Sequence, residues 1–382
     1  MNLDELDFEA LIQAATKDGP SAAAALGRLR QIADSSSSER DKVLLAWRAA
    51  ASREPMPAQL WMLFAAIQNK SGDRLSAIRS WHQASKSRGA IASDLLLASL
   101  GVASEQDWRQ WVSLFRDTRA TYIRDAYADI RHAVGARDLF RIDRALAGYL
   151  GEATVFSPHP TQRPKVMYVP GLRGQLGFLD PASHELVQPL LDQSTAIREE
   201  FDQAMMAGVG IEPFLGPMTE QQAEGYVAGP AGAAWNAIFF YRHGERFEDS
   251  HIRFPRTSAA LDALNLCRID GQAPEILFSI LQPQTRIQPH HGVTNARVVI
   301  HIPLQIPSGC YLELTGIGRR YWQEGQAVVF DDSFEHAAEN PSTQVRGILL
   351  MDAWHPDLSD AECRAFRAII EAITRIESLE LN

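Results

Sequence analysis

The first 150 residues carry apolar side chains at the spacing of α-helices. Leu3, Leu6, Phe8, Leu11 and Ile12 recur every three or four residues, which places them on one face of a helix. Segments broken by serine, proline and glycine continue this pattern to about residue 150. We predict an α-helical domain over residues 1–150. Its further helices are expected at 21–32, around Val43, Leu44, Leu45 and Trp47, and at 60–67, 75–84, 107–115, 121–134 and 138–149.

Two of these helices form an apparent pair. Segments 60–67 and 75–84 are joined by Ser71-Gly72-Asp73, and the second has alanines at 77 and 84. Paired short helices with small contact residues resemble tetratricopeptide hairpins. The full set of repeat positions does not recur at a constant period, so an irregular helical domain fits equally well.

The spacing of apolar residues changes in the second part of the chain. After one more helix predicted at 185–206, the apolar runs become short and alternate with a period of two, which is typical of strands. Several such strands interrupted by proline and glycine predict a sandwich or barrel. A last helix at 360–376 begins with Ser359 as cap and Glu362 three residues on. The fold class is α+β, with a β-rich domain over 151–382 and strands at 237–241, 276–281, 296–306, 311–314, 327–330 and 345–351.

Composition and charge narrow the possible partners. The net charge of −10 over 382 residues argues against nucleic acid, which requires a concentrated basic surface. Cys267, Cys310 and Cys363 show no CxxC spacing, so neither a disulfide framework nor a zinc site is indicated. The start of the chain is acidic, and no run approaches the ~20 apolar residues of a membrane helix. We expect a cytoplasmic protein without a membrane partner.

Three segments combine apolar strands with ionisable side chains. Arg297, Val299 and His301 share one face of a strand, His336 follows a strand that ends at Phe330, and Arg346 interrupts an apolar strand. A buried arginine is costly without an anion. No acidic residue occupies a matching position on these strands, so a bound carboxylate is the expected partner. Two histidines on neighbouring strands could bind a first-row metal through neutral nitrogens.

These segments resemble the aspartyl/asparaginyl β-hydroxylase family over about 235–356. The matching string is Pro289-His290-x-Gly292-x-Thr294-Asn295-x-Arg297, His301, Glu324-Gly325, Phe330-Asp331-Asp332-Ser333-Phe334-Glu335-His336, Arg346 and Asp352-Ala-Trp354-His355-Pro356. The resemblance implies a double-stranded β-helix, Fe(II), 2-oxoglutarate as cosubstrate, O2, and hydroxylation of an aspartyl/asparaginyl-type or related amino-acid substrate.

The resemblance also implies roles for individual residues. His290 and His336 match the two iron ligands, and Ser279 and Arg346 match the residues that hold the distal carboxylate of 2-oxoglutarate. The remaining expected contacts are Trp235, Val299 and His301 to the cosubstrate and Arg297 to the substrate. Gly292 stands where most such oxygenases carry a metal-binding carboxylate, and water takes that place in this family.

Other interpretations remain open. Relatives that hydroxylate aspartyl residues have an arginine at the position of Val299, so the substrate could be a free small metabolite or a lipid. The barrel could also be inert while the helical domain binds a peptide or another protein partner. Locally, the histidines could be structural, Arg346 could pair with Asp332 or Glu335, and Ser279 could be a small core residue. Asp331 and Asp332 are expected to cap the turn before His336, and His291 is expected to be exposed.

Overall fold

The computed structural model describes residues 7–17, 20–53, 56–86, 105–173, 177–216, 225–230 and 234–378. The chain forms two compact units, one of Met1–Asp129 with Ala368–Asn382 and one of Ile130–Arg367. The division between the units lies after Asp129, and the domain limits drawn at residue 150 stay a prediction.

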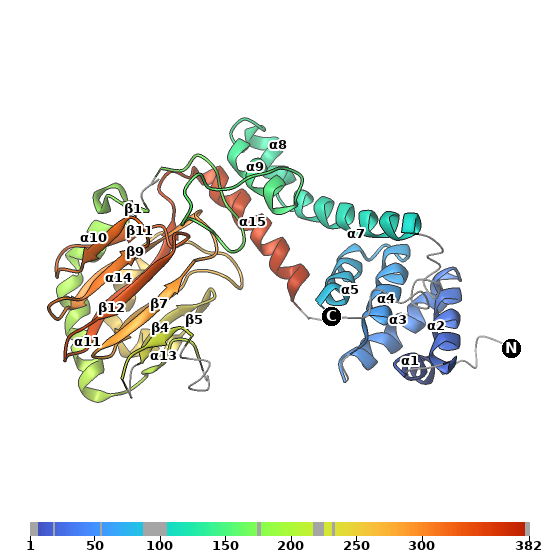
Figure 1. Cartoon of the computed structure of the whole chain (residues 1–382), viewed down its shortest axis with the longest axis horizontal. Helices are drawn as coiled ribbons and strands as arrows, with labels where there is room; N and C mark the ends of the chain where they lie inside the picture. The colour runs from blue at the N-terminus through green and yellow to red at the C-terminus, as the bar shows by residue number, and fades with distance from the viewer. Residues whose placement is uncertain are drawn as a thin grey trace. The chain divides into compact units, whose positions relative to one another are not determined.

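Helices make up the first unit (Figure 1). Aromatic rings pack against one another in its core. Trp47 stacks on Phe64 with ring centroids 4.0 Å apart and meets Trp61 edge-on at 4.9 Å. The helices are α1 (Phe8–Ala15), α2 (Pro20–Ala33), α3 (Ser37–Ala51), α4 (Ala58–Lys70), α5 (Arg74–Lys86) and α7 (Glu105–Asp125). The predicted helical region is confirmed, and its likeness to tetratricopeptide hairpins stays a prediction.

One predicted break between helices is wrong. The segments expected at 107–115 and 121–134 are instead α7 and α8 (Ala128–Val134). Neither glycine nor proline interrupts α7, and the hydroxyls of Thr118 and Thr121 donate to carbonyls one turn back, at Leu114 and Asp117. These bonds let threonine remain inside a helix.

Two antiparallel sheets form the centre of the second unit (Figure 1). The larger contains β1 (Phe178–Leu179), β2 (Glu212–Pro213), β4 (Trp235–Arg242), β5 (Glu245–Arg246), β6 (Ile276–Leu281), β8 (Arg297–Gln305), β11 (Val328–Phe330) and β13 (Arg346–Trp354). The smaller contains β3 (Val227–Ala228), β7 (Thr285–His290), β9 (Tyr311–Leu314), β10 (Gly318–Tyr321) and β12 (His336–Asn340). The orders β11-β8-β13-β6 and β10-β9-β12-β7 are those of a double-stranded β-helix, so the expected α+β fold is confirmed.

Helices cover the outer face of the larger sheet. The described α-helices of this unit are most of α8, α9 (Phe140–Tyr149), α10 (Val187–Asp192), α11 (Ser194–Ala207), α13 (Glu248–Arg253), α14 (Pro255–Asp262) and the first part of α15 (Asp360–Glu377). Phe201 of α11 lies over Gly347 of β13, where an added Cβ would come within 2.1 Å of its ring. A glycine is therefore required for this close approach, which seats α11 on the strand that carries Arg346.

Two further sequence predictions have clear outcomes. The capping box of α15 is confirmed, because Ser359 Oγ accepts from the Glu362 N–H at 3.3 Å and Glu362 Oε2 accepts from the Ser359 N–H at 3.0 Å. The single helix expected at 185–206 is wrong, since Gln193 separates α10 from α11. The Ser194 hydroxyl donates to the Leu191 carbonyl at 2.6 Å, a local bond that competes with helix continuation.

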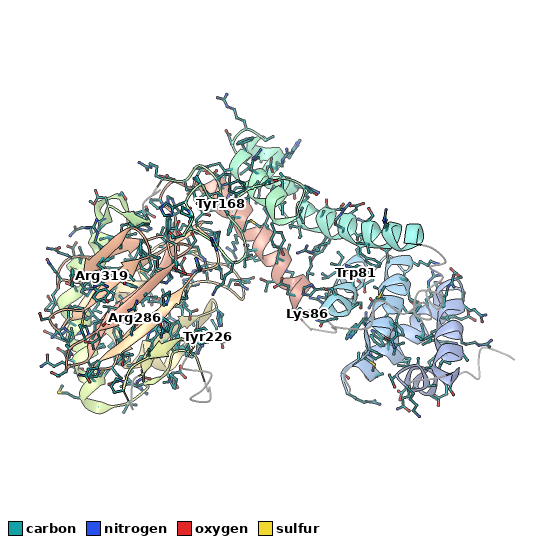
Figure 2. The ribbon with its side chains drawn as sticks, viewed as in Figure 1. Trp81, Lys86, Tyr168, Tyr226, Arg286 and Arg319 are labelled. Atoms are coloured by element: carbon teal, nitrogen blue, oxygen red, sulfur yellow. The ribbon has the colours of Figure 1, made fainter. Side chains whose placement is uncertain are left out.

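The outward face of the smaller sheet carries paired charges. Arg286 of β7 lies 3.7 Å from both Glu313 and Glu339, and Arg319 of β10 lies 3.4 Å from Glu313 (Figure 2). Exposed pairs of this kind contribute little stability. No helix among the described residues has the length and apolar character needed to cross a bilayer.

Candidate functional site

A cavity of about 490 Å³ opens between the two sheets. The larger sheet contributes alternate residues of β8 and β13, because successive side chains of a strand point to opposite faces. The smaller sheet contributes both histidines of the matched motif. The cavity contains all eight residues singled out from the sequence, namely Trp235, Ser279, His290, Arg297, Val299, His301, His336 and Arg346.

His290 and His336 face each other across β7 and β12. Their Cα atoms are register partners and their ring centroids lie 4.0 Å apart. Each Nδ1 lies within hydrogen-bond distance of the carbonyl two residues earlier, 2.8 Å to Gln288 and 2.9 Å to Phe334. A carbonyl only accepts, so we assign the proton of each neutral ring to Nδ1, which leaves both Nε2 lone pairs free for a metal.

The electrostatics of the pair favour neutral rings. Burial, with the nearby His290, lowers the pKa of His336 to about 3. Burial also lowers the pKa of His290. Both rings are therefore unprotonated at neutral pH, as metal ligation requires. A structural role alone would need no such accumulation of uncharged nitrogen donors in one cavity.

Gly292 and Asp332 explain why a third ligand is missing from the matched motif. A Cβ added at Gly292 would lie 2.2 Å from the Asp332 carboxyl oxygens, so a side chain at this position would require Asp332 to move. The Gly292 N–H also donates to the Asp332 carbonyl at 2.7 Å. The carboxylate of Asp332 thus takes up the space that a residue at 292 would use.

Arg346 lies at the other end of the cavity and is 1% exposed. One terminal nitrogen donates to the carbonyl and the hydroxyl of Ser279, both at 3.2 Å, and the guanidinium lies 5.0 Å over the Trp322 ring. Its Nε has no hydrogen-bond partner, and no carboxylate pairs with it among the described residues. The alternative of an ion pair with Asp332 or Glu335 is therefore wrong. Burial lowers the pKa of Arg346 to about 10, so it stays charged and unpaired.

Three neighbours orient this end of the cavity. The Trp235 indole N–H donates to Ser279 Oγ at 3.0 Å, so the serine accepts two bonds and can donate its own proton into the cavity. The Trp322 indole N–H donates to His301 Nδ1 at 3.2 Å, which puts the proton of a neutral His301 on Nε2. Burial, with the charge of Arg346, lowers the pKa of His301 well below its usual value.

Arg297 corrects an argument made from the sequence. We expected no acidic partner for it, but Asp352 of β13 accepts a hydrogen bond from its guanidinium. Burial opposes the charged form of Arg297, but the Asp352 carboxylate, together with the nearby acidic groups of Cys267 and Asp332, raises the pKa of Arg297 overall. The bound carboxylate inferred from unpaired arginines therefore applies to Arg346 alone.

The family of these residues follows from sequence comparison. Residues 192–356 match the family described as Aspartyl/Asparaginyl beta-hydroxylase. This part of the chain belongs to that family. The aspartyl/asparaginyl β-hydroxylase family typically uses Fe(II) and 2-oxoglutarate.

Named relatives match only in part. The aspartyl/asparaginyl beta-hydroxylase of Mus musculus is 35% identical over 35% of this chain and 18% of that protein. Aspartate beta-hydroxylase domain-containing protein 2 of Mus musculus is 30% identical over 53% of this chain and 58% of that protein. The chain thus spans less than two thirds of the length of either. A crystal structure of a Pseudomonas putida prolyl-4-hydroxylase matches 42% of this chain and 86% of its own, with 12% identity and a TM-score of 0.26.

The side chains that line the site are of the kinds needed to bind the family's metal and cosubstrate. Among the described residues, no group of three or more His, Cys, Asp or Glu side chains is arranged to hold a metal. A metal here would take two imidazoles from the protein and its other ligands from water or cosubstrate. The unpaired Arg346 Nε supplies a donor that suits a carboxylate.

Sequence reasoning missed or misplaced several residues of this family site. Trp322, Phe214 and Lys165 also line the cavity, and no motif pointed to them. The cap predicted for Asp331 is confirmed by its bond to the Ser333 N–H at 2.9 Å, whereas Asp332 faces the cavity. His291 is half-buried, contrary to the exposure expected for it.

The metal-free protein should lose stability as Asp332 ionises. Burial, with the Asp331 carboxylate, raises the pKa of Asp332 from 3.8 to about 7. Between these pH values the folded state binds more protons than the unfolded state, so wild-type stability falls as the pH rises. Asp332→Asn should therefore unfold at a higher Tm than wild type, by about 2–4 °C per kcal/mol. The difference should grow from pH 5 to 7 and then level off in thermal scans with chelator, and a pH-independent difference would contradict this assignment.

Proposed function

We propose that this chain is an Fe(II)- and 2-oxoglutarate-dependent dioxygenase that hydroxylates an aspartyl/asparaginyl-type or related amino-acid substrate. One observation carries the proposal: two neutral imidazoles with free Nε2 atoms share one cavity with a buried guanidinium that lacks a carboxylate partner. Membership of residues 192–356 in the hydroxylase family supports it.

The residues divide into a metal end and a cosubstrate end. His290 and His336 would hold the iron through Nε2. When bound, iron and 2-oxoglutarate supply the oxidising power, because O2 is consumed as 2-oxoglutarate becomes succinate and CO2 and the substrate gains a hydroxyl group. The chain supplies orientation, fixed charge and exclusion of water.

At the cosubstrate end, Arg346 would donate to the distal carboxylate of 2-oxoglutarate, joined by the free hydroxyl proton of Ser279. His301 would donate a hydrogen bond from Nε2 to the cosubstrate near the metal. Trp235 stacks on Phe214 with ring centroids 3.7 Å apart, and Val299 packs with the apolar residues of the same cavity. These side chains would exclude water and hold the cosubstrate in one orientation.

The charge balance of the cavity favours a second candidate substrate. Arg297 is neutralised by Asp352, and Val299 offers no charge, so neither provides a free cation for an anionic substrate group. A carboxylate substrate held by Arg297 would have to break a buried pair, which typically costs several kcal/mol. An uncharged group of a free small metabolite or a lipid would meet no such cost, and Arg297 would then orient the substrate as part of the pair.

Succinate formation tests the proposal directly. Full-length protein loaded with Fe(II) should convert 2-oxoglutarate to succinate, and candidate amino acids, peptides, metabolites and lipids should show a mass gain of one oxygen atom. Binding of metal and 2-oxoglutarate without turnover of any candidate would favour a binding module over an enzyme. Failure to bind either would overturn the proposed function. A cytoplasmic location and a protein partner for the helical unit remain predictions.

A further inference from the structure

A single segment bonds to both loops that carry the candidate metal ligands. We call residues 157–169 the strap; Tyr168 marks its later part in Figure 2. One loop, residues 331–335, leads into His336, and the other, residues 291–295, follows His290. The strap precedes the region matched to the hydroxylase family, so nothing in the matched motif assigns it a role.

The first half of the strap pairs with the loop before His336. The Arg163 N–H donates to the Ser333 carbonyl at 2.8 Å, and the Glu335 N–H donates to the Thr161 carbonyl at 2.8 Å. The His159 ring also lies 5.1 Å from the Phe334 ring. These bonds hold the backbone immediately before His336.

The second half pairs with the loop after His290. The Lys165 N–H donates to the Gly292 carbonyl at 3.1 Å, and the Val166 N–H donates to the Val293 carbonyl at 2.9 Å. The Asn295 side chain also bonds to the strap: its Oδ1 accepts from the Val169 N–H at 2.7 Å, and its Nδ2 donates to the Val169 carbonyl at 2.8 Å. The same short segment thus spans the backbones of both ligand loops.

Gln162 lies where the strap meets the buried Asp331. Its amide nitrogen donates to Asp331 Oδ2 at 2.7 Å and to Ser333 Oγ at 3.1 Å, while Ser157 donates to its amide oxygen. Asp331 is 4% exposed, and its other oxygen accepts from the Ser333 N–H. Gln162 therefore satisfies the carboxylate oxygen that the turn itself leaves unpaired.

We propose that Gln162 is a positioning residue for the metal centre, which it serves by fixing the turn that delivers His336 opposite His290. The inference rests on the metal-binding part of the proposed function. Groups that orient metal ligands typically contribute 10–100-fold to metal affinity. Without Gln162, Asp331 would be left with a buried unpaired oxygen, and the turn would relax to hydrate it.

The experiment is a titration of full-length, metal-free protein with Mn(II), followed by electron paramagnetic resonance. Gln162→Leu keeps the side-chain volume and removes the amide, so Mn(II) should bind about 10–100-fold more weakly than to wild type. Arg163→Ala is the matched control, because that exposed side chain donates only to the Pro160 carbonyl and its backbone bond survives. It should bind Mn(II) like wild type.

The outcomes separate the two proposals. If wild type binds no Mn(II), the proposed function fails. If wild type and Gln162→Leu bind Mn(II) equally while the variant's Tm drops, Gln162 is merely structural and the inference is overturned. Should Gln162→Leu not fold, Gln162→Asn keeps an amide that is one methylene too short. The inference requires this second variant to weaken Mn(II) binding at unchanged fold, measured by circular dichroism.

Discussion

Replacing either His290 or His336 with alanine should abolish succinate formation and lower Mn(II) affinity by at least about 100-fold. Loss of a residue that merely orients a metal ligand already lowers metal affinity by up to about 100-fold, and these two residues are the ligands themselves. The two Nε2 atoms are the only protein donors that the proposed site offers a metal, since the described residues contain no cluster of three or more ligating side chains. One remaining imidazole would compete poorly with water for the metal. Turnover of 2-oxoglutarate and Mn(II) titration measure the two effects.

His291→Ala is the matched control for His290→Ala. His291 is the adjacent residue and also half-buried, but it is not among the residues that line the cavity. This variant should therefore retain Mn(II) binding and succinate formation. Full turnover by His290→Ala or His336→Ala, with His291→Ala unaffected, would show that the imidazole pair is structural.

The sequence was most informative where local pattern determines the outcome. Alternation along β8 correctly placed Arg297, Val299 and His301 on one face, because the pleat of a strand has a fixed period of two. The change from helical to strand spacing likewise indicated the α+β fold. The ordered motif around His290 and His336 was specific enough to predict that two distant segments meet in one cavity.

Contacts set by strand register could not be read in the same way. Asp352 pairs with Arg297 because β13 lies beside β8 in one register, and a shift of one residue would turn every side chain to the other face. The strands β7 and β12 also escaped prediction. β12 reads His-Ala-Ala-Glu-Asn, which has few of the β-branched and aromatic residues that mark strands, and β7 ends with Pro289 and His290.

Residues from remote segments that hold the site in place also could not be predicted from the sequence. Gln162 and Trp322 carry no motif, yet one bonds to the turn before His336 and the other to His301. Both contacts depend on loops brought together by the fold, and a single sequence does not encode such proximity in any local pattern. The chemistry of the site was thus readable, whereas the residues that hold it in place required the structure.

Arg346→Met should affect stability and cosubstrate binding in opposite directions. The guanidinium is buried without an anion, and burial lowers its pKa to about 10, so the folded metal-free protein bears an uncompensated charge. Methionine fills similar space without that charge and should leave the Tm of the metal-free protein equal to or above that of wild type. Functional sites commonly retain such destabilising groups.

Binding of 2-oxoglutarate to the same variant should collapse. Removing one partner of a buried, hydrogen-bonded ion pair typically costs about 2–5 kcal/mol, which corresponds to roughly 30- to 5,000-fold in Kd. Arg346→Lys keeps a charge but loses the two parallel donors, so its affinity should fall between those of wild type and Arg346→Met. Calorimetric titration of the anaerobic Mn(II)-loaded protein with 2-oxoglutarate measures all three. We expect these changes because only a bound carboxylate would make the burial of an unpaired Arg346 favourable. If Arg346→Met instead has a lower Tm and normal affinity for 2-oxoglutarate, Arg346 stabilises the fold and does not bind the cosubstrate.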